Sequence, residues 1–211
     1  MKREAAKSRG DIANRKVSTL YLVMAALFTA VTFVGTILIR IPVGIGYVNF
    51  GDAVVMIAAV VLGPVGAALA GGLGSALADL VGFAMYAPFT LVIKGLEGFV
   101  CGVVFKSLLK GKNPYLRALV SFLLGAATVV VGYAMTDMLL VLFGVAASDG
   151  NIALTAVLAG VATLVPSLIQ VGVSAAVALV VSPKLPTLTL LNENKNRYNQ
   201  CEKLPTQKSL D

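Results

Sequence analysis

Long apolar tracts, separated by short polar or glycine- and proline-rich breaks, fill the chain from residue 17 to residue 181. A helix needs about 20 apolar residues to cross a membrane, and glycine and proline clusters mark where such helices end. The pattern predicts an all-α, polytopic membrane protein with six transmembrane helices, some of them short. These helices are expected at residues 18–39, 51–63, 64–81, 88–106, 116–143 and 152–181, with a long loop over residues 40–50.

The predicted third helix, residues 64–81, carries small residues in two registers of four. One register is Gly63, Ala67, Gly71 and Ser75, and the other is Gly66, Ala70, Gly74, Ala78 and Gly82. Small residues at this spacing let helix backbones approach closely in lipid. This helix is therefore expected to lie wedged between neighbours on two sides.

Composition supports a membrane protein, because 58% of the residues are hydrophobic and 13% are charged, whereas soluble domains carry about 25% charged residues. Residues 1–16 form a basic arm before the membrane domain of residues 17–181. The tail of residues 182–211 has no apolar period and is expected to be disordered and cytoplasmic.

The net charge of +7 comes from three clusters of lysine and arginine, within residues 2–16, 106–117 and 184–208. Loops rich in lysine and arginine lie on the cytoplasmic side of membrane proteins. Six crossings would place all three clusters on that side, with both termini in the cytoplasm. The charge is thus explained by membrane orientation in the cell membrane, and no nucleic-acid partner is expected.

Several classes of chemistry are disfavoured by what the sequence contains. It has no histidine, its two cysteines stand far apart, and it carries no phosphate-binding loop of the form G-x-x-x-x-G-K-[ST]. We therefore expect no enzyme, no metal site and no cofactor. Any energy from ATP would have to come from a partner protein.

Polar side chains occur sparsely within the apolar tracts, and their predicted depths converge on the outer half of the bundle. A charged side chain in the membrane costs about 2.5–3.5 kcal/mol on insertion scales, so it usually marks a site or a buried pair. The candidate substrate-binding residues are Asn49, Asp52, Asp79, Tyr86, Lys94, Glu97, Tyr133, Asp137 and Gln170.

Structural roles could explain several of these charged residues equally well. Asp52 could cap the second helix. Asp79 and Lys94 could form a buried ion pair between the third and fourth helices. Glu97 follows Lys94 by three residues, so these two side chains could also satisfy one another.

The last two helices leave the same choice open. Asp137 could simply face extracellular water. Gln170 could bond across helices, or to backbone groups that Pro166 frees.

Three segments resemble a known family. They are N-F-G-D at residues 49–52, the glycine- and alanine-rich helix that ends S-A-L-A-D at residue 79, and Y-A-P-F-T-L-V-I-K-G-L-E-G at residues 86–98. Together they resemble the substrate-binding S component of an energy-coupling factor (ECF) vitamin transporter. The resemblance covers the first half of the chain well and the second half by hydropathy alone.

The resemblance implies capture of a vitamin from outside and its delivery with a membrane coupling (T) subunit and two ATPase subunits. It also implies that Ala26 and Ala30 dock against the coupling subunit. Small residues four apart can equally pack helices within one chain. The alternative is an autonomous proton- or ion-coupled carrier with Asp79 and Glu97 as relay carboxylates.

The inventory of the candidate site bears on its ligand. Aromatic rings, one lysine, carboxylates and several amide or hydroxyl groups suit a small heterocycle with hydroxymethyl groups, such as vitamin B6 or a hydroxymethylpyrimidine. The resembling family also includes riboflavin carriers, and a three-ring ligand could stack across Tyr86 and Tyr133. The small-ring vitamins are favoured, with riboflavin next.

Overall fold

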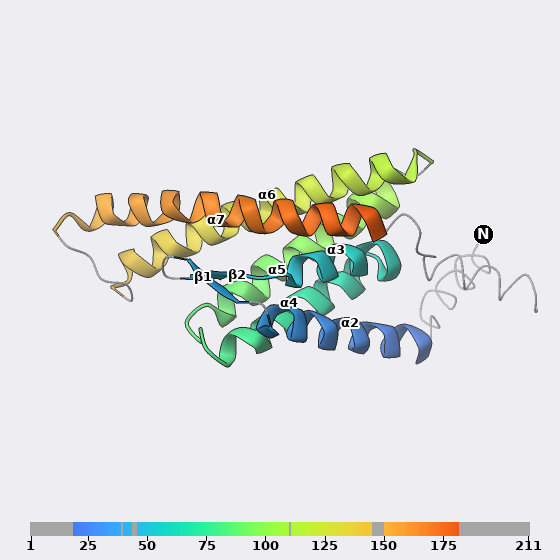
Figure 1. The fold of residues 1–211 in the computed structure, drawn as a ribbon, viewed down its shortest axis with the longest axis horizontal. Coiled ribbons are helices and arrows are strands. Elements are labelled where there is room, and N and C mark those ends of the chain that lie inside the picture. Colours follow the sequence, from blue (N-terminus) through green and yellow to red (C-terminus); the bar gives the residue numbers. More distant parts are fainter. Residues whose placement is uncertain (1–18, 39, 44–45, 110, 145–149, 182–211) are drawn as a thin grey trace, which may run out of the picture.

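A computed structural model describes residues 19–38, 40–43, 46–109, 111–144 and 150–181. The predicted arm at residues 1–16 and the predicted tail at residues 182–211 lie outside the described residues. Six α-helices run alternately in opposite directions along the long axis of the molecule (Figure 1). They are α2 (Thr19–Leu38), α3 (Gly51–Leu62), α4 (Pro64–Leu80), α5 (Ala87–Val103), α6 (Pro114–Leu142) and α7 (Ile152–Val181).

The predicted all-α membrane architecture is confirmed, and each helix begins and ends within a few residues of its expected place. Four helices are long and apolar enough to cross a membrane: α2, α5 with its extension to Leu108, α6 and α7. That extension is the π-helix η1 (Val104–Leu108). The helices α3 and α4 are shorter apolar segments of 12 and 17 residues.

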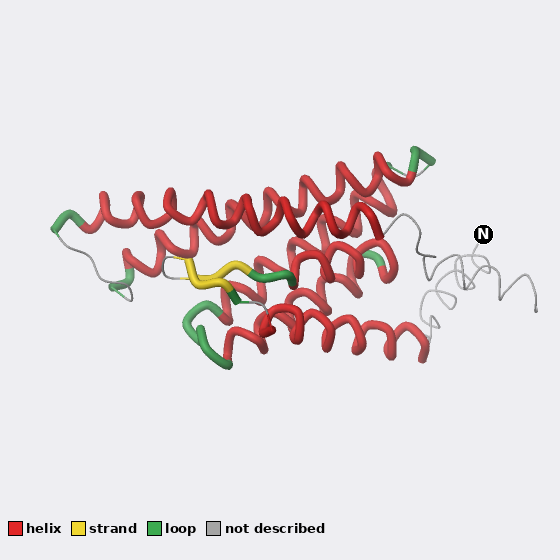
Figure 2. Tube along the Cα trace, viewed as in Figure 1, coloured by secondary structure: helices red, strands yellow, loops and turns green. Residues whose placement is uncertain are grey.

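The loop expected over residues 40–50 contains a β-hairpin, which the sequence pattern did not predict. Strand β1 (Ile41–Val43) pairs antiparallel with β2 (Gly46–Val48), in a register that places Ile41 opposite Val48. Figure 2 shows this hairpin as the one pair of strands among the described helices. It follows α2 directly and leads into α3, and β2 contacts α7.

The short α3 explains why a polar residue near its start lies deep in the molecule. At about 1.5 Å per residue its 12 residues span about 18 Å, whereas the hydrocarbon core of a bilayer is about 30 Å thick. The hairpin occupies the remaining depth at this end of the bundle (Figures 1 and 2). Backbone that is not helical is tolerated at membrane depth where protein surrounds it.

The helix α4 lies wedged between α2, α3 and α5, as its small residues predicted. A side-chain carbon at Gly71 would lie 2.8 Å from the carbonyl oxygen of Lys94 in α5, and one at Gly74 would lie 2.7 Å from that of Thr29 in α2. Contacts under 3.0 Å are too close for any side chain there. The predicted turn before α4 is also confirmed, because Gly63 adopts a φ of 86° that favours glycine and Pro64 begins the helix.

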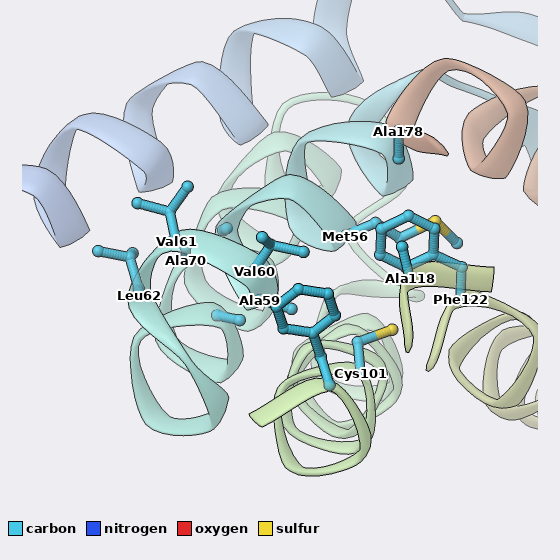
Figure 3. Close-up of a cluster of buried hydrophobic side chains, with 13 residues drawn as sticks. Met56, Ala59, Val60, Val61, Leu62, Ala70, Cys101, Ala118, Phe122 and Ala178 are labelled. Carbon is cyan, nitrogen blue, oxygen red and sulfur yellow. The ribbon is translucent and has the colours of Figure 1, made fainter. Parts of the chain in front are cut away.

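An apolar core fills the half of the bundle away from the hairpin. Figure 3 shows buried side chains from α3 to α7 gathered there, among them Met56, Cys101 and Phe122. The cysteine thiol donates a hydrogen bond to the carbonyl of Ser121, 3.3 Å away. The two halves of the bundle thus differ in chemistry, with polar groups near the hairpin and apolar ones at the other end.

Candidate functional site

The centre of the candidate site is an ion pair between Asp52 of α3 and Lys94 of α5. The ammonium of Lys94 donates to Oδ1 of Asp52, and the side chains of Lys94 and Asp52 are 1% and 0% exposed. Asp52 reaches this depth because α3 begins at Gly51, below the hairpin. A buried pair of this kind costs desolvation energy, which further hydrogen bonds must offset.

Those further hydrogen bonds come from Gln170 of α7. Its amide nitrogen donates to Oδ2 of Asp52 at 2.8 Å, and its amide oxygen accepts from the backbone N–H of Asn49 at 3.0 Å. The side chain of Asn49 accepts from the N–H of Gly51 at 2.8 Å. One glutamine therefore ties the ion pair to the segment that joins the hairpin to α3.

Glu97 is the second carboxyl group beside Lys94, one turn further along α5. Its Oε2 lies 3.3 Å from the ammonium of Lys94, and the side chain is fully buried. The contact lacks the geometry of a hydrogen bond, and neither carboxyl oxygen of Glu97 has a hydrogen-bond partner among the described residues. The expected pairing of Lys94 with Glu97 is present, but it is the weaker of the two.

Aromatic and hydroxyl groups from α5 and α6 border this cluster. The ammonium of Lys94 lies 5.5 Å from the centre of the Tyr133 ring, within range of a cation–π interaction. The hydroxyl of Tyr133 lies 3.2 Å from that of Thr90. Beside them, Phe89 and Tyr133 pack against the buried Ile93, Val129 and Val171. The polar cluster thus adjoins an aromatic and aliphatic surface.

A second polar cluster surrounds Asp137 of α6. Tyr86, in the loop before α5, donates to Oδ1 of Asp137 at 2.6 Å, and Thr163 of α7 donates to Oδ2. Burial and the neighbouring Asp137 both raise the pKa of Tyr86, which is therefore the donor in this bond. Asp137 is buried, and the interpretation that it merely faces water is wrong.

Two other structural interpretations from the sequence also need correction. Asp52 does not cap α3, because both of its oxygens contact other helices and the N-cap residue, Phe50, makes no side-chain capping bond. The predicted pair of Asp79 with Lys94 is also wrong, since Lys94 pairs with Asp52 and Glu97. The reason is the packing at Gly71, which places the backbone of α4 against that of α5 and leaves the lysine side chain to reach α3.

Asp79 is buried near the end of α4, and its backbone carbonyl accepts from Gly82 and Phe83. It lies close enough to Tyr86 to act on that hydroxyl electrostatically. Close by, Arg40 donates to the carbonyl of Ala78 at 2.5 Å. Asp79 therefore belongs to the same end of the bundle as the two clusters without contacting Lys94.

Of the predicted site residues, the structure brings five into one network: Asn49, Asp52, Lys94, Glu97 and Gln170. Tyr133 borders it, Tyr86 and Asp137 form the second cluster, and Asp79 lies near Tyr86. Gln170 bonds across helices, as one interpretation had it. Sequence reasoning missed Thr90 and did not count Thr163, a polar residue of the last helix, among the candidate site residues. Helical spacing gives the signal, because Thr90 lies one turn before Lys94 and Thr163 lies two turns before Gln170 on the face that α7 buries.

The two alanines expected at a coupling interface, Ala26 and Ala30, are exposed on α2. Leu22 and Val34 are exposed at the same four-residue spacing on that helix. Both alanines thus lie on a surface that the rest of the described chain leaves uncovered.

The part of the chain that the structure describes contains no group of three or more histidine, cysteine, aspartate and glutamate side chains able to hold a metal.

Comparison with known families bears directly on this arrangement. Residues 16–186 match the model of the family described as ECF-type riboflavin transporter, S component. The chain belongs to this family. The match includes all six described helices, so the S-component resemblance that the first half of the sequence suggested extends over the whole membrane domain. An S component is part of a transporter and not an enzyme, and this one is a multi-pass membrane protein.

A similar protein is found in Pyrococcus woesei, where it is called an uncharacterized protein in the gap 3' region. This S component is 47% identical to it over 102 residues. The matched segment covers 47% of this chain and 66% of that relative.

Proposed function

We propose that this S component binds riboflavin, or a closely related flat heteroaromatic vitamin, at the hairpin end of the bundle and delivers it across the membrane with an ATP-driven ECF module. The observation that carries the proposal is the joining of buried polar groups with an aromatic surface at one end of an otherwise apolar bundle. Small-molecule sites typically combine an apolar lining with a few converging polar groups. The family description supports riboflavin as the first candidate.

The pairing of the charged groups supports a neutral ligand. The sequence-based preference for vitamin B6 or a hydroxymethylpyrimidine assumed that Lys94 and the carboxylates were available to a small, polar or zwitterionic ring. In the structure Lys94 pairs with Asp52 and Glu97, and Asp137 accepts from Tyr86 and Thr163. The groups then suited to recognition are aromatic faces, hydroxyls and amides, which match a large uncharged ring. The small-ring vitamins remain the second candidates.

The orientation we propose places the hairpin outside and both termini in the cytoplasm. Lys106, Lys112 and Arg117 lie around the α5–α6 turn, at the end of the bundle where α2 begins and α7 finishes (Figure 1). Positive residues favour the cytoplasmic side. The ligand site would then open toward the medium from which the vitamin is taken.

The partners we propose are a membrane coupling subunit and two ATPase subunits. The sequence carries no phosphate-binding loop, so ATP hydrolysis must be supplied by another chain. Exposure of Ala26 and Ala30 supports the α2 face as the docking surface for the coupling subunit, because small residues allow close helix approach in lipid.

Two measurements test the proposal together. Native mass spectrometry of the purified chain should identify a co-purified flavin, without any choice of ligand beforehand. Uptake of labelled riboflavin into cells that express the chain with an ECF module should stop when the ATPases are disabled by substitution of their phosphate-loop lysines. Uptake that persists with disabled ATPases would instead support the ion-coupled carrier.

A further inference from the structure

The buried cluster at the centre of the bundle contains two acids and one base. Asp52 and Glu97 both approach the ammonium of Lys94, and all three side chains are at most 1% exposed. If both acids were ionised, the cluster would carry one uncompensated negative charge at membrane depth. Such a charge in an apolar interior is so costly that the group takes up a proton instead.

The two acids differ in their hydrogen bonds. Asp52 accepts from Lys94 and from Gln170, so both of its oxygens have a donor. Neither oxygen of Glu97 has a hydrogen-bond partner among the described residues, and its 3.3 Å contact with Lys94 lacks hydrogen-bond geometry. Donors favour the ionised form of a carboxyl group, and burial without donors favours the neutral form. Asp52 therefore has the donors that stabilise a carboxylate, and Glu97 has none among the described residues.

No second cation compensates Glu97 from the helices packed around α5. Asp52 is the one ionisable side chain of α3, and Asp79 is that of α4. From α6, Tyr133 borders Lys94 while Asp137 is bonded to Tyr86. The nearest ionisable group further along α5 is Cys101, an acid, which donates to Ser121.

Arg40 donates to the carbonyls of Thr36 and Ala78 at the hairpin end. The other basic side chains of the described helices lie at the opposite end of the bundle. Lys106 of η1 donates to the carbonyl of Val61 at 3.2 Å, and Arg117 of α6 donates to that of Phe105 at 3.0 Å. Neither side chain lies beside the Asp52–Lys94 pair. The electrostatic surroundings of Glu97 within the described residues are therefore Lys94 and a second carboxylate.

We infer that Glu97 is a proton-binding site of the bundle, which holds a proton at neutral pH and releases it only with disruption of the Asp52–Lys94–Gln170 junction. Deprotonation would place a second carboxylate in competition for Lys94. The ammonium would then be shared, and Asp52 would lose part of the bond that fixes α3 to α5. Because Gln170 joins Asp52 to Asn49, the disturbance would reach the hairpin end, where the proposed vitamin site lies. The ligand part of this inference rests on the proposed function.

The sign of the pH dependence follows from linkage. The folded chain holds a proton that the unfolded carboxyl group has already lost at neutral pH. Stability from this site is then greatest at low pH and falls as the pH rises. Affinity for the vitamin should fall in the same direction.

Infrared spectroscopy of the full chain in lipid nanodiscs tests the proton directly. The wild-type protein should show the carbonyl stretching band of a buried, protonated carboxyl group at neutral pH. Glu97→Gln should remove that band, and Thr128→Ala, which changes no acid, should leave it. A missing wild-type band, or a band that survives Glu97→Gln, would overturn the inference.

Thermal unfolding between about pH 5 and pH 9 gives the second readout. The midpoint should fall with rising pH in the wild type and should be nearly flat in Glu97→Gln, whereas Asp52→Asn should lower it at every pH. A Glu97→Gln midpoint lowered as much as that of Asp52→Asn would contradict a neutral Glu97.

Riboflavin titrated at both ends of this pH range should bind the wild type at least about tenfold more weakly at the alkaline end. If riboflavin binds at neither pH, the proposed function fails while the band and the midpoints still report on the proton.

Discussion

Lys94 of α5 forms a buried ion pair with Asp52 of α3, which lies 42 positions earlier in the chain. Removal of one partner leaves a lone buried charge, which costs about 3–5 kcal/mol of unfolding free energy. Replacement of both by apolar residues removes that cost. We expect Asp52→Leu and Lys94→Met each to be strongly destabilising, and the double variant to recover most of the loss.

Denaturant unfolding in detergent measures these variants. Thr128→Ala is a suitable control, because Thr128 is half-buried on α6 and its hydroxyl donates to the carbonyl of Leu124 one turn earlier. A double variant as unstable as the sum of the single ones would show that the two charges do not act as a pair.

In the cluster around Asp137, the losses of unfolding free energy from removing the two hydroxyl donors should not be additive. Tyr86→Phe or Thr163→Val each removes one donor from the buried carboxylate of Asp137, and each should cost about 1–3 kcal/mol. Both together should cost more than their sum, because the carboxylate then loses both donors. Adding Asp137→Asn to that pair should restore stability. Additive losses, or no rescue by Asp137→Asn, would show that these side chains act independently.

Close packing of α4 against α5 predicts different outcomes for two helical glycines. A side-chain carbon at Gly98 would lie 2.5 Å from the carbonyl oxygen of Ala67, whereas one at Gly172 of α7 meets nothing within 4 Å. Gly98→Ala should therefore lower the unfolding midpoint by several degrees. Gly172→Ala should leave it unchanged or raise it, because alanine favours a helix by up to about 1 kcal/mol over glycine. Equal effects of the two substitutions would contradict this packing.

The exposed face of α2 should matter for transport and not for ligand binding. Ala26→Trp or Ala30→Trp adds bulk where close approach to a coupling subunit is proposed. We expect each to leave riboflavin affinity of the isolated chain unaltered and to abolish ATP-dependent uptake. Leu158→Trp, on the exposed face of α7, is the matched control and should transport normally. Normal uptake by both alanine variants would place the coupling interface elsewhere.

The order and extent of the helices could be predicted from the sequence because lipid imposes strong rules on apolar length and on the residues that end a helix. Glycine and proline mark the breaks at residues 40–46 and 63–64 clearly. The β-hairpin could not be predicted, since its strands have three residues each and leave no alternation long enough to detect.

The gathering of the polar residues at one end could be predicted from depth alone, but their pairing could not. Asp52 and Asp79 both lie in the predicted outer half, and depth does not distinguish them as partners of Lys94. The choice depends on how α4 and α5 rotate about their axes. That rotation follows from the contact between Gly71 and the backbone of Lys94, which appears only once the helices are packed.

The most direct test of the account is a fluorescence titration of riboflavin with the purified chain in detergent. We predict saturable quenching at one ligand per chain with a Kd below about 1 μM, undisturbed by an excess of pyridoxine or hydroxymethylpyrimidine and greatly weakened in Asp52→Leu. Saturable binding of pyridoxine or hydroxymethylpyrimidine with no response to riboflavin would contradict the proposed ligand. No saturable binding of any of the three would contradict the proposal of a vitamin site at the hairpin end.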